Sequence, residues 1–253
     1  MIMKNRQKYR QILLLASLLA YPLTFFVMSP DLLFFGASDR IVAGDVIFFG
    51  ILFLTAFLGG RLYCGWICPA GACQEFTFKI NNKPLNNKWN WIKFIPFIPW
   101  FAFFIIIIFL VSGFKEIDFF YKKAFGVSLI GLGEWIMYFG TVAIVVIPSI
   151  IKGKRWLCHY LCWVSPFMIV GGIIRDFFRI PSIRLRTIPT ECNNCGLCSK
   201  VCTMSLPVME MVKQGGINHN ECILCSTCVD SCKKSAIRFT FSSKQRNLIS
   251  TAL

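Results

Sequence analysis

The sequence predicts an α-helical membrane protein with four transmembrane helices, arranged as a duplicated hairpin and followed by a small, cysteine-rich α+β domain. Two observations lead to this expectation. The 253 residues are 56% hydrophobic and only 15% charged, whereas about 25% of the residues in a soluble domain are charged. Eight of the 13 cysteines form two quartets near the C-terminus, outside the apolar runs.

Four apolar runs are expected to span the bilayer, which takes roughly 20 residues per helix. They cover residues 12–28, 46–60 with an extension back to Ile41, 94–113 and 124–151. The first run follows a basic N-terminus but no small-residue cleavage site comes after it, so we expect an uncleaved helix rather than a signal peptide.

Lysine and arginine are unevenly divided between the two sides that these spans imply. The N-terminus, residues 61–93 and residues 152–155 hold 4, 5 and 3 of them, whereas loops 29–45 and 115–123 hold 1 and 3. Cytoplasmic loops are enriched in basic residues, so we expect a multi-pass protein of the cytoplasmic (inner) membrane with both termini in the cytoplasm. The formal charge of +15 is explained in this way, and no nucleic-acid partner is expected.

The chain changes character after the fourth span. Residues 163–174 form an apolar stretch too short to span, which predicts an interfacial or re-entrant segment. After Pro181 the sequence becomes polar and rich in cysteine. The expected divisions are a transmembrane domain over 1–162, an interfacial linker over 163–181, a cysteine-rich domain over 182–240 and a basic tail over 241–253.

The cysteine-rich domain contains the pattern C-x2-C-x2-C-x3-C twice, the second copy 30 residues after the first. The copies are Cys192, Cys195, Cys198 and Cys202, and then Cys222, Cys225, Cys228 and Cys232. Three closely spaced thiolates in a tight loop can hold three corners of an iron–sulfur cube. Two zinc sites are the alternative, since zinc also takes four thiolates, although zinc motifs more often pair two C-x2-C units.

This double pattern resembles the bacterial two-cluster ferredoxins, in which the fourth cysteine of each copy binds the other cluster. The resemblance implies a ferredoxin-like domain with two [4Fe–4S] clusters. One cluster would be held by Cys192, Cys195, Cys198 and Cys232, and the other by Cys222, Cys225, Cys228 and Cys202. The chain departs from the ferredoxin pattern after each fourth cysteine, where Thr203 and Lys233 stand in place of the usual proline.

A second kind of cysteine motif lies in the membrane part. Cys64 and Cys68 in "RLYCGWICP", and Cys158 and Cys162 in "RWLCHYLCW", form C-x3-C pairs 94 residues apart. Both pairs follow even-numbered spans and therefore lie on the cytoplasmic side. If each pair is helical its thiols share one face, and two facing pairs would supply the four thiolates of a third cluster. Cys73 has no counterpart and no assigned role.

Other chemistries for these pairs can be weighed. Attached haem needs C-x2-C-H, which is absent, and a b-type haem needs histidines inside the spans, where neither His159 nor His219 lies. Disulfides are disfavoured in the reducing cytoplasm. Zinc, copper and buried inert thiols stay open as alternatives.

The spans and motifs together resemble the NapH/NosR-type membrane polyferredoxins. The resemblance rests on "GRLYCGWICPAG" and its degenerate partner "KRWLCHYLCWVSPF", in which Trp163 replaces the proline that the family has after each pair. It implies an electron-transfer subunit of a quinol dehydrogenase system, passing electrons between the quinol pool and a reductase in anaerobic respiration. The implied partners are the lipid bilayer, the quinone pool and other redox subunits. The rival function is a maturation factor that reduces a metal or thiol during assembly of a respiratory enzyme.

Three charged residues complete the expectations. Arg61 and Arg155 each precede a cysteine pair by three residues. They either offset cluster charge or act as plain topology anchors. Glu134 is the one acidic residue well inside an expected span. It is a weak candidate for the proton acceptor of quinol oxidation, and a role at the rim or in helix packing is the alternative.

Overall fold

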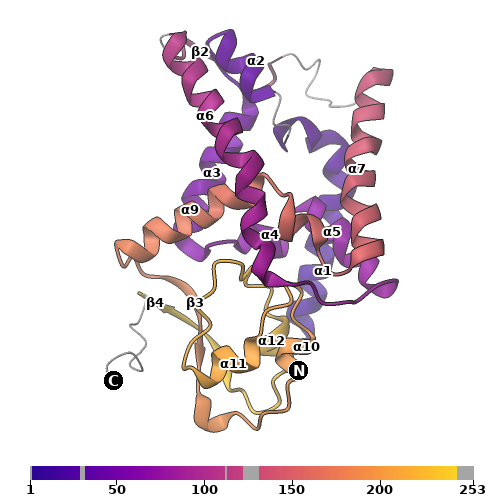
Figure 1. Cartoon of the computed structure of the whole chain (residues 1–253), viewed down its shortest axis with the longest axis vertical. Coiled ribbons are helices and arrows are strands. Elements are labelled where there is room, and N and C mark those ends of the chain that lie inside the picture. The colour runs from indigo at the N-terminus through magenta and orange to yellow at the C-terminus, as the bar shows by residue number, and fades with distance from the viewer. Residues whose placement is uncertain (1, 29–31, 112, 122–130, 244–253) are drawn as a thin grey trace.

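The computed structural model describes residues 2–28, 32–111, 113–121 and 131–243, which are mostly helical (Figure 1). Four longer helices dominate the structure; three of them form the upper part of Figure 1, and the fourth, α1, reaches down beside the cysteine-rich segment. They are α1 (Ile2–Thr24), α3 (Gly44–Gly59), α6 (Phe94–Leu110) and α7 (Leu132–Lys152). The shorter elements around them are η1 (Phe25–Met28), α2 (Leu32–Ser38), β1 (Ile41–Val42), α4 (Leu62–Trp66), α5 (Pro69–Phe76), η2 (Thr77–Lys79), η3 (Asn87–Lys93), β2 (Glu116–Ile117), α8 (Trp156–Tyr160) and α9 (Val164–Phe177).

Two of the described helical segments are long and apolar enough to cross a membrane, Asn87–Leu110 and Leu132–Lys152. Their outward side chains are large and apolar: Phe109 is 80% exposed and Ile136 is 65% exposed. Such a surface is unfavourable in water but suits a hydrocarbon solvent. The chain is accordingly a membrane protein. The third apolar helix, α3, has 16 residues, and the part of the expected fourth span before Gly131 lies outside the described residues.

The sequence suggested that the second apolar run extends back to Ile41 as one helix. The structure differs, because α3 begins at Gly44. Arg40 has a positive φ of 61°, which breaks the helical path, and Ile41–Val42 instead pairs in parallel with Glu116–Ile117 as a short two-stranded sheet. The apolar residues before Gly44 therefore serve a strand and not the helix.

Helix α1 begins ten residues before the apolar run that predicted it, at Ile2. Its basic first half is held by acidic partners, because Arg10 donates to both oxygens of Glu75 at 2.6 and 2.8 Å and Arg6 lies 3.3 Å from Asp230. The second half of α1 exposes a run of apolar side chains, among them Leu19 and Leu23. The N-terminus and the cysteine-rich segment consequently lie at the same end of the molecule (Figure 1).

Helix α9, which contains the short apolar stretch, crosses α3 at close range. A Cβ at Gly171 would lie 2.9 Å from the Ala56 Cβ and 3.0 Å from the Phe53 carbonyl oxygen, so the crossing requires glycine there. The buried face of α9 includes Met168, whereas Phe177 is 79% exposed. An amphipathic helix with an apolar outer edge is typical of a segment at the membrane surface.

The cysteine-rich segment is closed by two strands. β3 (Ser182–Thr187) pairs antiparallel with β4 (Ile237–Ser242), with Ser182 opposite Ser242. Between them lie η5 (Pro189–Glu191), α10 (Leu197–Lys200), α11 (Val208–Lys213) and α12 (Thr227–Ser231). β4 passes residue 240, where the domain was expected to end. Residues 244–253 of the expected basic tail lie outside the described part.

One hydrophobic core joins the membrane part to this segment. Phe49, Cys64 and Met168 from above belong to the same buried cluster as Met204 and Ile223 from below. Buried apolar contact of this kind favours a fixed arrangement of the two parts.

Candidate functional site

The four membrane cysteines come together at the base of the helices. Cys64, Cys68 and Cys158 are at most 5% exposed, and Cys162 is half-buried. Burial raises the pKa of Cys68 well above its usual range, and repulsion from the other three thiols adds to this rise. The four thiols thus lie near enough to repel one another, but Cys68 packs in a different hydrophobic cluster from Cys64, Cys158 and Cys162. The thirteen cysteines of the chain are all free.

The two C-x3-C motifs have the same local backbone, but they are not continuous helices. In the first, the N–H groups of Ile67 and Cys68 both donate to the Tyr63 carbonyl, at 3.0 and 3.1 Å; in the second, Leu161 and Cys162 both donate to Leu157, at 3.0 and 2.9 Å. Each short helix thus ends before its second cysteine. This repeated turn supports the duplication read from the sequence.

Arg61 and Arg155 are both buried, with 1% and 0% exposure. Arg61 forms an ion pair with Glu221, and Arg155 forms one with Glu75. Arg155 also donates from Nη1 to the Cys64 carbonyl at 2.8 Å. A plain topology anchor would keep its charge in water, so the burial of both arginines disfavours that interpretation.

A buried lysine completes the charge arrangement. Lys93 Nζ lies 2.6 and 2.7 Å from the two Glu221 oxygens and 3.4 Å from the Cys158 carbonyl oxygen. Glu221 thus bridges two buried cations. Although burial opposes its ionisation, Arg61 and Lys93 hold the pKa of Glu221 below its usual range.

The residues around the membrane thiols fit a negatively charged, thiolate-bound centre. Arg61 Nε and Nη2 are buried without a hydrogen-bond partner, and the guanidinium lies beside Cys64, where it opposes the rise in pKa that burial causes. A buried hydrogen-bond donor without a partner costs free energy, and the sulfur of a neutral thiol is only a weak acceptor for it. Metal-bound thiolates would supply the missing acceptors.

Two small cavities in the cysteine-rich segment are lined by the two ligand sets that the ferredoxin resemblance implies. One, of about 20 Å³, is lined by Cys192, Cys195, Cys198 and Cys232. The other, also about 20 Å³, is lined by Cys202, Cys222, Cys225 and Cys228. The fourth cysteine of each quartet therefore lies with the opposite quartet, as in the exchanged ligation of two-cluster ferredoxins.

These side chains are not gathered around single points. Within the described ranges, no three histidine, cysteine, aspartate or glutamate side chains are placed to hold one metal ion. A zinc site needs its sulfurs about 2.3 Å from a common centre. A [4Fe–4S] cluster makes no such demand, because each of its four cysteines binds a different iron atom.

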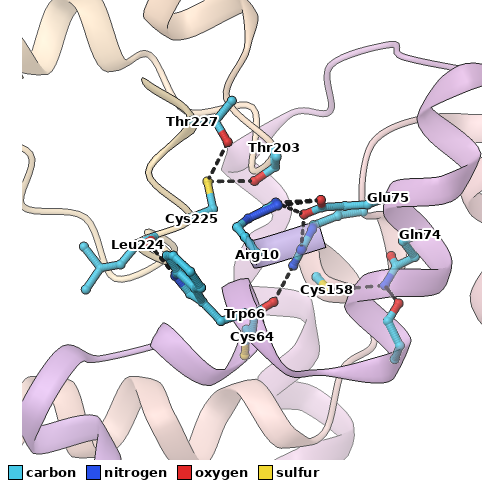
Figure 2. A network of polar contacts seen from close by, with 12 residues as sticks. Arg10, Cys64, Trp66, Gln74, Glu75, Cys158, Thr203, Leu224, Cys225 and Thr227 are labelled. Carbon is cyan, nitrogen blue, oxygen red and sulfur yellow. Dashed lines mark hydrogen bonds and ion pairs between the residues drawn. The ribbon is translucent and has the colours of Figure 1, made fainter. Parts of the chain in front are cut away.

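Thr203 occupies one of the places where ferredoxins have proline. Its Oγ1 lies 3.4 Å from Cys225 Sγ, and Thr227 Oγ1 lies 3.4 Å from the same sulfur (Figure 2). Two hydroxyl groups thus flank the Cys225 sulfur. The substitution of proline brings a hydrogen-bonding group to the second ligand set, which proline could not supply.

The residues between Cys64 and Cys68 contact the loop that holds the second ligand set. Trp66 Nε1 donates to the Leu224 carbonyl at 3.0 Å (Figure 2). A Cβ at Gly65 would lie 2.2 Å from the Ile223 carbonyl oxygen and 3.5 Å from the Cys225 nitrogen. Only glycine allows so close an approach of the two backbones.

Sequence reasoning missed the side chains that surround the membrane cysteines. Gln74 donates from Nε2 to Cys158 Sγ at 3.3 Å, and Glu75 lies between Arg10 and Arg155 (Figure 2). The signal was available in "CPAGACQE", where two polar residues follow an otherwise apolar turn. The two partners of Glu221, in contrast, are Arg61 and Lys93, which lie 160 and 128 residues away and could not be read from the sequence.

The two remaining candidates have local explanations. Glu134 lies in the first turn of α7, where its Oε2 accepts from the Gly131 N–H at 3.2 Å, as in helix capping. Cys73 packs against Val145 and Leu157, and burial raises the pKa of its thiol. Cys73 has the environment of an inert core thiol.

Comparison with known proteins agrees with this geometry. A family of 4Fe-4S binding domains matches residues 46–91, and a family of 4Fe-4S dicluster domains matches residues 191–237. MJ0750 of Methanocaldococcus jannaschii is 24% identical over 91% of each chain. The putative electron transport protein YccM of Escherichia coli is 24% identical over 78% of this chain and 56% of its own length. The ferredoxin-type protein NapH of Escherichia coli is 24% identical over 87% of this chain and 75% of its own. No solved structure matches significantly.

The fold and the two cysteine regions define a class, the membrane-bound iron–sulfur proteins that carry two [4Fe–4S] clusters. Their chemistry is electron transfer. Its relatives include the ferredoxin-type proteins NapH and MauN and the regulatory protein NosR, each 24–28% identical, so the chain is similar to polyferredoxins of the NapH/NosR type.

Proposed function

We propose that this protein passes electrons between the membrane quinol pool and a reductase system, using a third cysteine-bound centre in addition to its two ferredoxin clusters. Cys64, Cys68, Cys158 and Cys162 would hold that centre, and the two exchanged sets described above would hold the others. Iron–sulfur clusters bound by these thiolates supply redox chemistry whose potential depends on net charge and on hydrogen bonds to sulfur.

One observation carries this proposal above all others, the contact of Gly65 and Trp66 with residues 223–225. The first C-x3-C motif and the ligand loop of the second set touch through their backbones. A chain that used its membrane cysteines only for packing would not need this approach. The adjacency supports the membrane cysteines as one station of an electron path that continues into the ferredoxin domain.

The burial of the ferredoxin cysteines supports an order along that path. Cys202, Cys225 and Cys228 are each 8% exposed and Cys222 is half-buried, and Trp66 of the membrane motif bonds to Leu224 in their loop. Cys195 is exposed, and the rest of its set is half-buried. We infer that the set containing Cys195 exchanges electrons with another redox subunit, since it is the one that a partner can approach.

The topology belongs to the same proposal. α1 and α3 join α6 and α7 as the four spans, and the cysteine-rich domain faces the cytoplasm together with the N-terminus. The contacts of Arg6 with Asp230 and of Gln7 Nε2 with the Cys225 carbonyl, at 3.0 Å, support this common side.

The test is an iron and acid-labile sulfide count on anaerobically purified protein, repeated on the Cys64→Ser/Cys158→Ser variant. Two ferredoxin clusters contribute about eight irons and a third raises the count to about twelve. We expect about twelve in the wild type and about eight in the double variant. Cys73→Ala is the matched control, because it removes a buried thiol outside the site and should leave the count unchanged.

A second assay separates the proposed function from its rival. Reduction of the protein by a menaquinol analogue in nanodiscs is the expected result. Reduction of copper or of a protein thiol without any quinol activity would instead identify a maturation factor. A double variant that keeps the full wild-type iron content would refute the shared centre.

A further inference from the structure

Gln74 is a fully buried amide between the two halves of the membrane cysteine site. It lies on α5, directly after the first C-x3-C motif, and it is 0% exposed. Its Nε2 donates to the Ala70 carbonyl at 2.9 Å and to Cys158 Sγ at 3.3 Å. Its Oε1 accepts from the Leu157 N–H at 2.9 Å and from Ser149 Oγ at 3.3 Å. Both N–H positions of the amide and its oxygen therefore have partners, while the one hydroxyl hydrogen of Ser149 is shared with the nearer Val145 carbonyl at 3.0 Å.

The orientation of this amide is fixed by its neighbours. The Leu157 backbone N–H can only donate, so the group that faces it has to be the amide oxygen. The –NH₂ group then faces the Ala70 carbonyl, which can only accept, and the Cys158 sulfur. Cys158 Sγ consequently accepts a hydrogen bond, which a neutral thiol accepts weakly and a metal-bound thiolate accepts more strongly.

We propose that Gln74 is a positioning residue of the membrane-proximal centre, and that its N–H···S bond to Cys158 fixes the second half-site and favours the reduced state of that centre. This inference rests on the proposed third centre. Hydrogen bonds to ligand sulfurs raise the potential of iron–sulfur clusters, because the reduced form carries more negative charge.

The second half-site, Cys158 and Cys162, lacks a local feature that positions the first one. In the first motif, Pro69 follows Cys68 and begins α5. In the second, Trp163 follows Cys162, and Arg155 before the motif has a positive φ of 48°. Gln74 bonds to two consecutive residues of this motif, the Leu157 N–H and the Cys158 sulfur. Its contacts thus tie the second half-site, which lacks the proline, to the helix that the first half-site begins.

The test compares Gln74→Glu with wild type by redox titration followed by electron paramagnetic resonance. Glutamate keeps the shape and the acceptor for Leu157 N–H, but it offers no N–H to Cys158. At a fixed potential we expect the reduced-to-oxidised ratio of the membrane centre to fall about tenfold, equal to about 59 mV for one electron. The two ferredoxin clusters in the same sample serve as internal references and should not shift.

Two further variants separate the N–H···S bond from general packing. Ser149→Ala removes a contact of Gln74 but leaves the donor to Cys158, so its membrane centre should keep the wild-type potential. Gln74→Leu removes both donor and acceptor and should shift the potential in the same direction as Gln74→Glu.

The outcomes distinguish this inference from the proposed function. An unchanged potential in Gln74→Glu, at an iron content of about twelve, overturns the role of Gln74 alone. A potential shift of equal size in Ser149→Ala also overturns it, since packing would then suffice. A wild type with about eight irons refutes the membrane centre itself, and this inference with it.

Discussion

Gly65 offers the sharpest test of the contact between the membrane motif and the ferredoxin domain. In Gly65→Ala, the new Cβ would lie 2.2 Å from the Ile223 carbonyl oxygen, whereas ordinary Cβ contacts are 3.4–4 Å. The obstacle is a backbone atom and not the end of a flexible side chain. The ferredoxin loop or α4 therefore has to retreat by roughly 1 Å, in line with the cost of overpacking in tight cores.

The size of the effect follows from this displacement. Overpacking of a tight interior costs typically about 1–3 kcal/mol. A retreat of this size also stretches the hydrogen bond from Trp66 Nε1 to the Leu224 carbonyl, now 3.0 Å, beyond useful range. We expect the melting temperature to fall by several degrees, at about 2–4 °C per kcal/mol for a chain of this size.

The assay combines thermal unfolding in detergent with stopped-flow reduction of the ferredoxin clusters by a quinol analogue. Gly65→Ala should keep its iron, but the quinol analogue should reduce its ferredoxin clusters more slowly, because the loop that holds their ligands has moved away from the membrane motif. Gly50→Ala is the control, since a Cβ there has nothing within 4 Å. Wild-type melting and wild-type reduction rates in Gly65→Ala would refute the reasoning.

Two other substitutions test charged groups. Glu221→Gln leaves Arg61 and Lys93 buried without their shared carboxylate, and breaking a buried ion pair in this way costs about 3–5 kcal/mol. Calorimetry should therefore show a clear loss of thermal stability. An unchanged unfolding transition would contradict the bridging role of Glu221. Glu134→Gln retains an oxygen that can accept from the Gly131 N–H, so we expect wild-type stability and quinol oxidation within about twofold of wild type, given that glutamine also serves in capping boxes. A drop in quinol oxidation beyond tenfold, with stability intact, would instead identify Glu134 as the proton acceptor.

Motif spacing and the length of the apolar runs predict much of this protein. Two cysteine quartets 30 residues apart indicate a two-cluster domain because a local loop can present three thiolates. The twin C-x3-C motifs indicate a duplicated site for the same local reason. Helix boundaries are harder to predict: α1 starts at Ile2 because its basic residues find acidic partners on distant elements, which no hydropathy pattern records.

What the sequence alone determined is the chemistry: which residues are thiols, at what spacing, and on which side of the membrane they are expected. What only the tertiary structure decided is how that chemistry is surrounded. Arg61 and Arg155 became buried ion-pair partners instead of solvent-exposed charges, and Gln74 became a donor to Cys158. Glu221 pairs with Arg61, which lies 160 residues away in the sequence. The physical reason is that spacing encodes contacts within a turn, whereas charge pairing and burial depend on segments that meet only when the chain folds.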